Sequence, residues 1–217
     1  IIDNQVTHML AVPTMYAYVN ALIDPGTVDL QKSKLRLAMT GAAPFPIEIR
    51  DTFLKNYGIE ILEGYGLTEA SGFSTGNLNV PPKFGSIGVG LPSQEIAIMD
   101  NEGRFLEPNK PGEICIRSKA TMSRYLNNPE ATAESLRNGW LYTGDAGYMD
   151  EEGYIFMVGR TKEMINRGGE NIYPREIELV LEEHPGIQAA AVVGVPDPAL
   201  GERVKACIIP KTPDSLK

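Results

Sequence analysis

Residues 140–174 read WLYTGDAGYMDEEGYIFMVGRTKEMINRGGENIYP, and this stretch decides how the rest of the chain is interpreted. Glycine, acidic and aromatic residues interrupt two short apolar segments, which is typical of strands separated by tight turns. Asp145 follows a Thr-Gly turn at the end of the first segment, and Arg160 and Lys162 follow Gly159 at the end of the second. The pattern predicts two strand ends that present one acidic and two basic side chains to a ligand.

The first 80 residues alternate between strand-like and helix-like patterns, and glycine-rich turns follow two of the strands. Such a rhythm predicts an α/β layer whose site lies at the strand ends. Gly58 is expected to end the second helix, because glycine accepts the left-handed conformation at a helix C-terminus. Residues 6–12 are short and apolar, and the expected strands are 35–39 and 60–63. The expected helices are 13–23 and the segment ending at Tyr57, and the turns are 40–46 and 64–70.

Residues 81–160 change character and predict a small β-rich module, barrel-like in its short strands and turns. Strands are expected near 96–99, 112–118 and 153–158, with turns at 100–103 and 150–153. One helix interrupts them, with Asn128 as its N-cap and Pro129 at its first position. After Arg160, a helix over 174–184 and strands over 187–195 and 203–210 predict a second, small α/β domain.

Bulk composition excludes several classes of protein. The chain has 217 residues, 42% of them hydrophobic and 22% charged, which fits a globular protein. A formal charge of −8 argues against a nucleic-acid binder, because no basic stripe is available to neutralise phosphates. No apolar run approaches 18 residues, so we expect no integral membrane segment and a soluble, cytoplasmic protein.

The cysteines and histidines provide no catalytic pattern. Cys115 and Cys207 stand singly inside apolar runs, which predicts buried, reduced thiols rather than a disulfide or metal site. His8 and His184 are far apart in sequence and are expected to be structural or surface residues.

Taken singly, the polar residues of the predicted turns have ordinary structural interpretations as well. Asp145 alone fits a turn cap as well as it fits a ligand site, and Arg160 alone fits a surface ion pair better. Thr68 and Glu69 fit a helix cap with its first-turn acid. The pair Gly168-Gly169 fits a hairpin turn.

Taken together, the motifs resemble the adenylate-forming superfamily, which includes acyl-CoA synthetases, luciferases and the adenylation domains of peptide synthetases. The resemblance covers nearly the whole chain and is greatest to bacterial fatty-acid and aryl-acid CoA ligases. The motifs, in chain order, are Gly41-Ala-Ala-Pro44, Tyr65-Gly-Leu-Thr-Glu69, Gly112-Glu-Ile-Cys-Ile-Arg117, Thr143-Gly-Asp145, Gly159-Arg-Thr-Lys162 and Gly168-Gly-Glu-Asn-Ile-Tyr-Pro174.

The resemblance implies a role for each matching residue. Asp145 is similar to the acid that binds the ribose hydroxyls of ATP or AMP, and Arg160 to the arginine on the same nucleotide. Thr68 would meet the α-phosphate, and Glu69 would be the Mg²⁺ ligand, so both count as catalytic. The remaining cofactor-binding positions, which include walls of the adenine and acyl pockets, are Gly41, Ala42, Ala43, Glu63, Gly64, Tyr65 and Gly66.

The resemblance also implies a moving C-terminal part. Lys162 matches the hinge position, and Gly168 and Gly169 match the loop that lines the pantetheine tunnel for CoA. The domains would then be residues 1–160, the end of the large AMP-binding domain (α/β layer 1–80, β-rich module 81–160), and residues 161–217, an incomplete small domain.

The implied function is that of an ATP-dependent acid:CoA ligase, which forms an acyl adenylate from a carboxylic acid and Mg-ATP and transfers the acyl group to CoA. Two alternatives stay open: an adenylation domain that loads a carrier protein, and a non-catalytic nucleotide-binding fragment. The family's phosphate loop and C-terminal catalytic lysine have no counterpart in the sequence, so we expect a fragment that is inactive by itself. Neither the acid nor a homo-oligomeric state can be inferred from the sequence.

Overall fold

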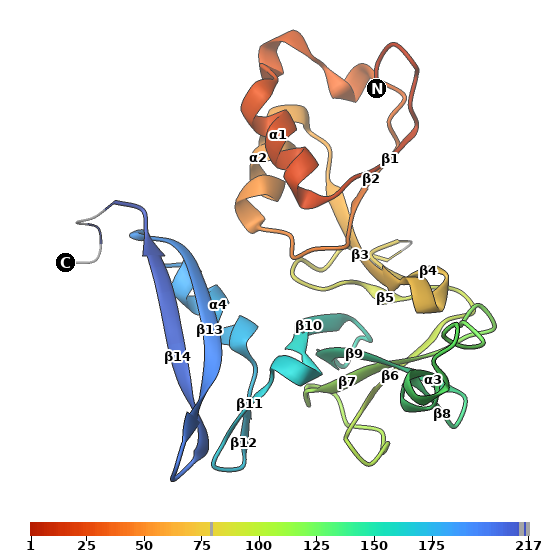
Figure 1. Cartoon of the computed structure of the whole chain (residues 1–217). Helices are drawn as coiled ribbons and strands as arrows, with labels where there is room; N and C mark the ends of the chain where they lie inside the picture. Colours follow the sequence, from red (N-terminus) through yellow and green to blue (C-terminus); the bar gives the residue numbers. More distant parts are fainter. Residues whose placement is uncertain (79, 213–214, 216–217) are drawn as a thin grey trace. The chain divides into compact units, whose positions relative to one another are not determined.

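The computed structural model describes residues 1–78, 80–212 and 215, and it confirms the predicted α/β class (Figure 1). The chain divides into two compact units. The first comprises Ile1–Ile96, Ile116–Leu141 and Asp150–Phe156, and the second comprises Ala97–Cys115, Tyr142–Met149 and Met157–Lys217. Residues on both sides of Lys162 therefore belong to one unit, and the domain division at residue 160 stays a prediction.

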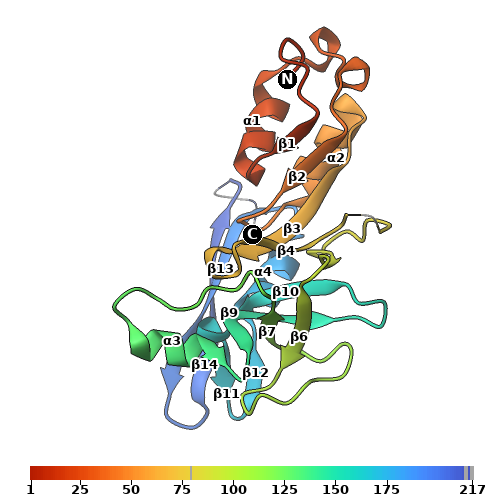
Figure 2. The same cartoon turned by 90° about the vertical axis from the view of Figure 1, so that its right-hand side faces the viewer.

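A five-stranded sheet in the order β1-β2-β3-β4-β5 forms the N-terminal layer. β1, β2 and β3 are parallel, whereas β4 is antiparallel to both β3 and β5. Two helices, α1 and α2, pack against each other. Figure 2 shows both of them next to the strands β1 and β2. The elements are β1 (His8–Leu10), α1 (Pro13–Leu22), β2 (Leu37–Thr40), α2 (Ile47–Tyr57), β3 (Ile61–Leu67), β4 (Gly72–Gly76) and β5 (Val89–Gly90), with short 3₁₀ turns at Pro25–Thr27, Leu30–Lys32 and Thr68–Ala70.

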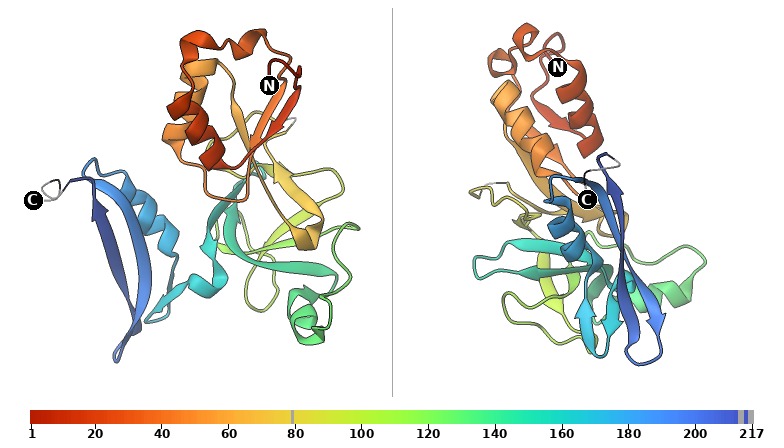
Figure 3. Two further views of the ribbon diagram at one scale, coloured as in Figure 1. Left: turned by 45° about the horizontal axis from the view of Figure 1, so that its top comes forward. Right: turned by 90° about the vertical axis from the view of Figure 1, so that its left-hand side faces the viewer.

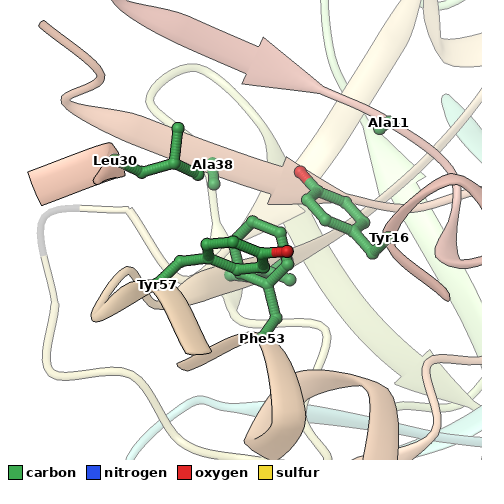
Figure 4. Close-up of a cluster of buried hydrophobic side chains, with 7 residues drawn as sticks. Ala11, Tyr16, Leu30, Ala38, Phe53 and Tyr57 are labelled. Atoms are coloured by element: carbon green, nitrogen blue, oxygen red, sulfur yellow. The ribbon is translucent and has the colours of Figure 1, made fainter. Parts of the chain in front are cut away.

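Aromatic side chains hold the two helices together in the core of this layer (Figure 4). The rings of Tyr16 and Phe53 meet edge to face at 5.2 Å, and the rings of Phe53 and Tyr57 lie 4.8 Å apart. Such pairs contribute about 1 kcal/mol each beyond the area they bury. The hydroxyl of Tyr16 donates to the carbonyl of Met39 at 2.8 Å, which ties α1 to β2 and satisfies the one polar atom of the buried ring.

The predicted end of the second helix is confirmed. Gly58 has a φ of 67°, and its N–H donates to the carbonyl of Leu54 at 2.8 Å. An L-residue with a Cβ pays a steric cost in that conformation, so glycine at this position sets where α2 stops.

The prediction that residues 64–70 form a turn is wrong for its first half. β3 continues to Leu67 and pairs with β4, with a register shift between Tyr65 and Gly66. A Cβ on Gly66 would lie 2.0 Å from the carbonyl oxygen of Gly72. The glycines therefore permit two strands to approach closely, and only the segment Thr68–Ala70 turns.

The β-rich module is a second five-stranded sheet, with the order β10-β9-β7-β6 and β8 paired to β9. Its predicted turns are confirmed: Gly103 N–H donates to Asp100 O at 3.0 Å, and Gly153 N–H to Asp150 O at 3.1 Å. The helix cap is also confirmed, since Asn128 Oδ1 accepts from Ala131 N–H at 3.0 Å. The elements are β6 (Glu95–Met99), β7 (Gly112–Arg117), α3 (Pro129–Ser135), β8 (Leu136–Arg137), β9 (Trp140–Met149) and β10 (Ile155–Arg160).

The C-terminal part contains a four-stranded sheet in the order β12-β11-β14-β13, with α4 packed against β13 (Figure 3). A carboxylate oxygen of Glu178 on α4 accepts the N–H of Val192 at 2.9 Å, which joins the helix to the strand. The elements are a 3₁₀ turn (Thr161–Glu163), β11 (Ile165–Arg167), β12 (Glu170–Ile172), α4 (Pro174–Glu182), β13 (Ile187–Asp197) and β14 (Gly201–Pro210).

Two expectations from composition have different outcomes. Cys115 is buried as predicted, but the prediction of a buried Cys207 is wrong, because that residue is exposed on β14. Within the described residues, neither cysteine forms a disulfide. Within the part of the chain that the structure describes, no helix is long and apolar enough to cross a membrane.

Candidate functional site

Asp145 and Arg160 form an ion pair in the second unit. Arg160 Nε donates to Asp145 Oδ1 at 2.9 Å. The Asp145 side chain is 8% exposed and that of Arg160 51% exposed, so the carboxylate is nearly covered while the guanidinium faces solvent. Two residues that the sequence places 15 positions apart are thus in contact.

The backbone around Asp145 is held by neighbouring side chains. Thr143 Oγ1 donates to the carbonyl of Ile114 at 2.7 Å and accepts the N–H of Asp145 at 3.1 Å. Gly144 N–H donates to Glu113 Oε1 at 2.8 Å. These bonds fix the backbone from which the Asp145 side chain projects, and a ligand site benefits from such a rigid support.

The prediction that Asp145 ends a strand is wrong, because it lies inside β9, which runs from Trp140 to Met149. Gly144 has a φ of 75° within that strand, so the Thr-Gly pair bends the strand without ending it. Arg160 is the last residue of β10, as predicted.

A carboxylate held in this way can accept hydrogen bonds from two vicinal hydroxyl groups, as a ribose provides, because its two oxygens offer several acceptor directions. The arginine places a positive charge beside the carboxylate, and its planar guanidinium is suited to hydrogen bonds with oxygen acceptors. The geometry therefore fits the predicted ribose site, although a structural ion pair has the same geometry.

The turn Thr68–Ala70 carries the second group of predicted residues, in the first unit. Thr68 is exposed and Glu69 is half-buried. Ser71 closes the turn in the left-handed conformation, with a φ of 62°, and its N–H donates to Thr68 O at 3.0 Å. Tyr125 donates its hydroxyl to Glu69 Oε1 at 2.8 Å.

Glu69 can bind Mg²⁺ only together with other ligands, such as phosphate oxygens and water molecules. Among the described residues, no group of three or more His, Cys, Asp or Glu side chains could hold a metal ion. Mg²⁺ is commonly bound by one or two carboxylates together with substrate phosphates and water. A single half-buried carboxylate beside an exposed hydroxyl matches that donor set and does not match a metal cage made by protein alone.

Close packing of the main chain accounts for the glycines of the predicted adenine and acyl pockets. A Cβ on Gly41 would lie 2.8 Å from the carbonyl oxygen of Gly64, and a Cβ on Gly64 would lie 3.0 Å from the ring of Phe73. Ala42 and Ala43 are exposed, and Ala42 has a φ of 68°, a conformation that costs a non-glycine residue about 1 kcal/mol. Strain of this kind is often stored at functional sites.

Glu63 lines a cavity of about 20 Å³ in the first unit, together with Asn77 and Ser86. That volume holds about one water molecule. Burial raises the pKa of Glu63 to about 7. The cations that line the same cavity already have partners, since Arg50 pairs with Glu60 at 3.1 Å and Lys83 pairs with two acidic side chains.

Replacing Glu63 should change how stability depends on pH. Its folded-state pKa is raised, so between about pH 4.5 and 7 the unfolded chain releases a proton that the folded chain keeps, and stability falls as pH rises. The loss amounts to about 3 kcal/mol. The glutamine in Glu63→Gln cannot ionise, so the variant should not lose this stability. Between pH 4.5 and 8, the difference in free energy of unfolding between the variant and the wild type should therefore shift by about 3 kcal/mol in favour of the variant, as measured by urea denaturation. If the free energy of unfolding depended on pH in the same way in both proteins, a raised pKa of Glu63 would be contradicted.

The residues of the predicted moving part lie on exposed turns. Lys162 is exposed in the 3₁₀ turn Thr161–Glu163, and Thr161 Oγ1 donates to Gly144 O at 3.1 Å. Gly168 and Gly169 form the turn between β11 and β12 with φ values of 62° and 93°. These positive values favour glycine whether or not a ligand binds. The hairpin interpretation is therefore sufficient for the geometry, and the hinge and tunnel roles stay predictions.

Sequence reasoning missed Tyr125, which contacts Glu69, and it named Thr143 in a motif without assigning it the role of fixing the backbone of Asp145. Thr143 precedes the Gly-Asp pair in the sequence, and a hydroxyl at that position is a common turn-stabilising feature that indicates its role. No sequence signal places Tyr125 beside Glu69, because 56 residues separate them.

Comparison with known proteins identifies the class. The AMP-binding enzyme family matches residues 1–126, and the AMP-binding enzyme C-terminal domain matches residues 176–217. The chain belongs to the AMP-binding enzyme family, as the resemblance of its motifs predicted.

Its relatives include a long-chain-fatty-acid–CoA ligase of Bacillus subtilis, which is 43% identical over 92% of this chain and 36% of the relative. A feruloyl-CoA synthase of an Amycolatopsis species is 40% identical over 96% of this chain and 42% of the relative. The chain thus spans well under half of the length of these curated relatives.

Solved structures with the same fold include an o-succinylbenzoate CoA synthetase from Bacillus subtilis in complex with ATP and a magnesium ion. It matches with a TM-score of 0.82 and 33% identity, over 97% of this chain and 43% of the other. An amide bond synthetase from Marinactinospora thermotolerans matches with a TM-score of 0.84 and 33% identity over the same shares.

Proposed function

We propose that the whole protein carrying this chain is an ATP-dependent acid:CoA ligase. The observation that carries the proposal is the 43% identity to a fatty-acid CoA ligase across 92% of the chain. The contact between Asp145 and Arg160 supports it, because it provides a carboxylate suited to a ribose. A cytoplasmic location, where ATP and CoA are available, is part of the same proposal.

The reaction has two steps, and in each step one bond forms while another breaks. In the first, a carboxylate oxygen of the acid attacks the α-phosphorus of ATP, and pyrophosphate leaves with the electrons of the broken P–O bond. In the second, the sulfur of CoA attacks the acyl carbon, its proton is released, and AMP leaves. The protein is expected to contribute mainly positioning and electrostatic stabilisation.

Each candidate residue has a defined part in this scheme. Asp145 accepts the ribose hydroxyls, and Arg160 donates to the same nucleotide. Thr68 donates its hydroxyl to the α-phosphate, and Glu69 is the protein ligand for Mg²⁺. A bound Mg²⁺ would neutralise part of the phosphate charge. Glu63, Gly64, Tyr65, Gly66 and the segment 41–43 form the adenine and acyl walls, and Lys162, Gly168 and Gly169 serve the transfer to CoA.

Acid-dependent exchange of labelled pyrophosphate into ATP tests the first step. We expect the whole protein to exchange label only when Mg²⁺ and a suitable acid are present, across a panel of aliphatic and aromatic acids. An inactive Glu69→Ala variant that still folds would tie the exchange to the Thr68–Ala70 turn. If no acid of a broad panel supports exchange, the proposal is wrong.

An amine acceptor is a second candidate for the transfer step. Its support is the likeness to an amide bond synthetase, which matches as well as the CoA synthetase does. Incubating the protein with ATP and its acid in the presence of either CoA or a primary amine distinguishes the two. We expect a thioester, because the curated relatives are CoA ligases; an amide formed in preference would favour the second candidate.

A further inference from the structure

The segment 118–125 is attached to the turn Thr68–Ala70 at three points, although about 50 residues separate the two in sequence. Met122 N–H donates to the carbonyl of Glu69 at 2.7 Å. Ser71 Oγ donates to the carbonyl of Ala120 at 2.6 Å. The hydroxyl of Tyr125 donates to Glu69 Oε1 at 2.8 Å. Both the backbone and the side chain of Glu69 are therefore held by this segment.

Tyr125 is itself anchored to the N-terminus of α3. Its N–H donates to Thr132 Oγ1 at 3.0 Å, and Thr132 Oγ1 donates to the carbonyl of Asn128 at 2.7 Å. Asn128 Oδ1 in turn caps the helix by accepting from Ala131 N–H. The phenol thus reaches Glu69 from a backbone that a capped helix fixes in place.

A glutamate side chain has three rotatable bonds, so a free carboxylate samples many positions and loses that freedom when it binds a cation. Mg²⁺ demands ligands in nearly ideal octahedral directions. A phenol that occupies one oxygen fixes the rotation of the carboxylate, and among the described residues no hydrogen bond reaches the other oxygen, Oε2.

We propose that Tyr125 is a positioning residue that orients the Glu69 carboxylate, with Oε1 held by the phenol and Oε2 directed to a divalent cation. The proposal rests on the proposed function in one respect, the assignment of Glu69 as the Mg²⁺ ligand. It goes beyond that assignment because it names Tyr125 as the residue through which α3 and the segment 118–125 would hold the metal-binding carboxylate in place.

The test measures cation binding directly and activity separately. Mn²⁺, a paramagnetic substitute for Mg²⁺, is titrated into the whole protein with a non-hydrolysable ATP analogue, and free Mn²⁺ is followed by electron paramagnetic resonance. Tyr125→Phe should weaken Mn²⁺ affinity about tenfold, since a hydrogen bond to a charged group has that order of value. It should also raise the Mg²⁺ concentration needed for half-maximal pyrophosphate exchange, with the rate at saturating Mg²⁺ within about twofold of the wild type.

Two variants provide the controls. Tyr154→Phe removes the hydroxyl of another tyrosine in the same unit, which donates to the carbonyl of Pro81 at 2.6 Å. This variant should leave Mn²⁺ affinity unchanged. In a Glu69→Ala background, Tyr125→Phe should not weaken Mn²⁺ affinity further, because the first substitution has already removed the hydrogen bond between the two side chains.

The outcomes separate this proposal from the function itself. Unchanged Mn²⁺ affinity in folded Tyr125→Phe, or an equal loss in Tyr154→Phe, would overturn the positioning role even if the wild type exchanges pyrophosphate. A specific loss of Mn²⁺ affinity in Tyr125→Phe would support the role even if no acid is activated, in which case the proposed reaction alone fails.

Discussion

Asp145→Ala in the whole protein is expected to weaken AMP binding by about 100-fold or more. The variant removes a carboxylate that would accept two hydroxyl groups, and hydrogen bonds to charged groups contribute about 1.5–3 kcal/mol each. A loss of about 3 kcal/mol corresponds to that factor. Stability should change less, because the partner Arg160 is 51% exposed and water can solvate it when the pair is broken. Calorimetric titration with AMP measures the first effect, and urea denaturation the second.

Asp100→Ala is the matched control for this prediction. Asp100 also pairs with an arginine, Arg104, whose Nε lies 2.7 Å from Oδ2, and it belongs to the same unit. It lies in the turn 100–103 and has no proposed part in nucleotide binding. AMP affinity should therefore stay at the wild-type value. Equal AMP affinity in the wild type and in a folded Asp145→Ala variant would remove Asp145 from the site.

Gly66→Ala is expected to destabilise the protein by about 4 kcal/mol or to prevent folding. The new Cβ would lie 2.0 Å from Gly72 O and 2.6 Å from the Cα of Phe73, both backbone atoms of the paired strand β4. Backbone cannot rotate away as a flexible side chain can, so β3 and β4 would have to separate where the register already shifts. Chemical denaturation and circular dichroism measure the effect.

Gly76→Ala tests whether the cost comes from that contact. Gly76 lies in β4, opposite Gly64, and a Cβ there would have as its nearest neighbour a side-chain carbon of Leu78 at 3.6 Å. Its free energy of unfolding should remain within about 1 kcal/mol of the wild-type value, since alanine also reduces the entropy of the unfolded chain. A tolerated Gly66→Ala, or two variants with equal losses, would contradict the proposed clash.

Several elements could be predicted because their signals are local. Proline at the first turn of α1, the left-handed Gly58 after α2 and the Asn128 cap of α3 each act within a few residues of the chain. The order of the motifs also indicated the family, because that order is read directly from the sequence without knowing which distant segments are in contact. These features depend on backbone conformation that neighbouring residues impose.

Other features depend on contacts between distant segments. The tyrosine at 125 reaches Glu69 across 56 positions, and the extension of β3 through Gly66 exists because β4 offers a backbone to pair with. The exposure of Cys207 is similar: its apolar neighbours suggested a core, but which face of β14 is covered depends on what packs there. No local pattern encodes such partners.

By itself, the sequence determined the α/β class, most helix ends and turns, and the family, because short-range sterics and ordered motifs are contained in the chain. Tertiary structure decided that Asp145 lies within a strand beside Arg160, that Glu63 is half-buried with a raised pKa, and that Glu69 is held by Tyr125. These depend on desolvation and on hydrogen bonds between segments, which exist only after the chain has folded.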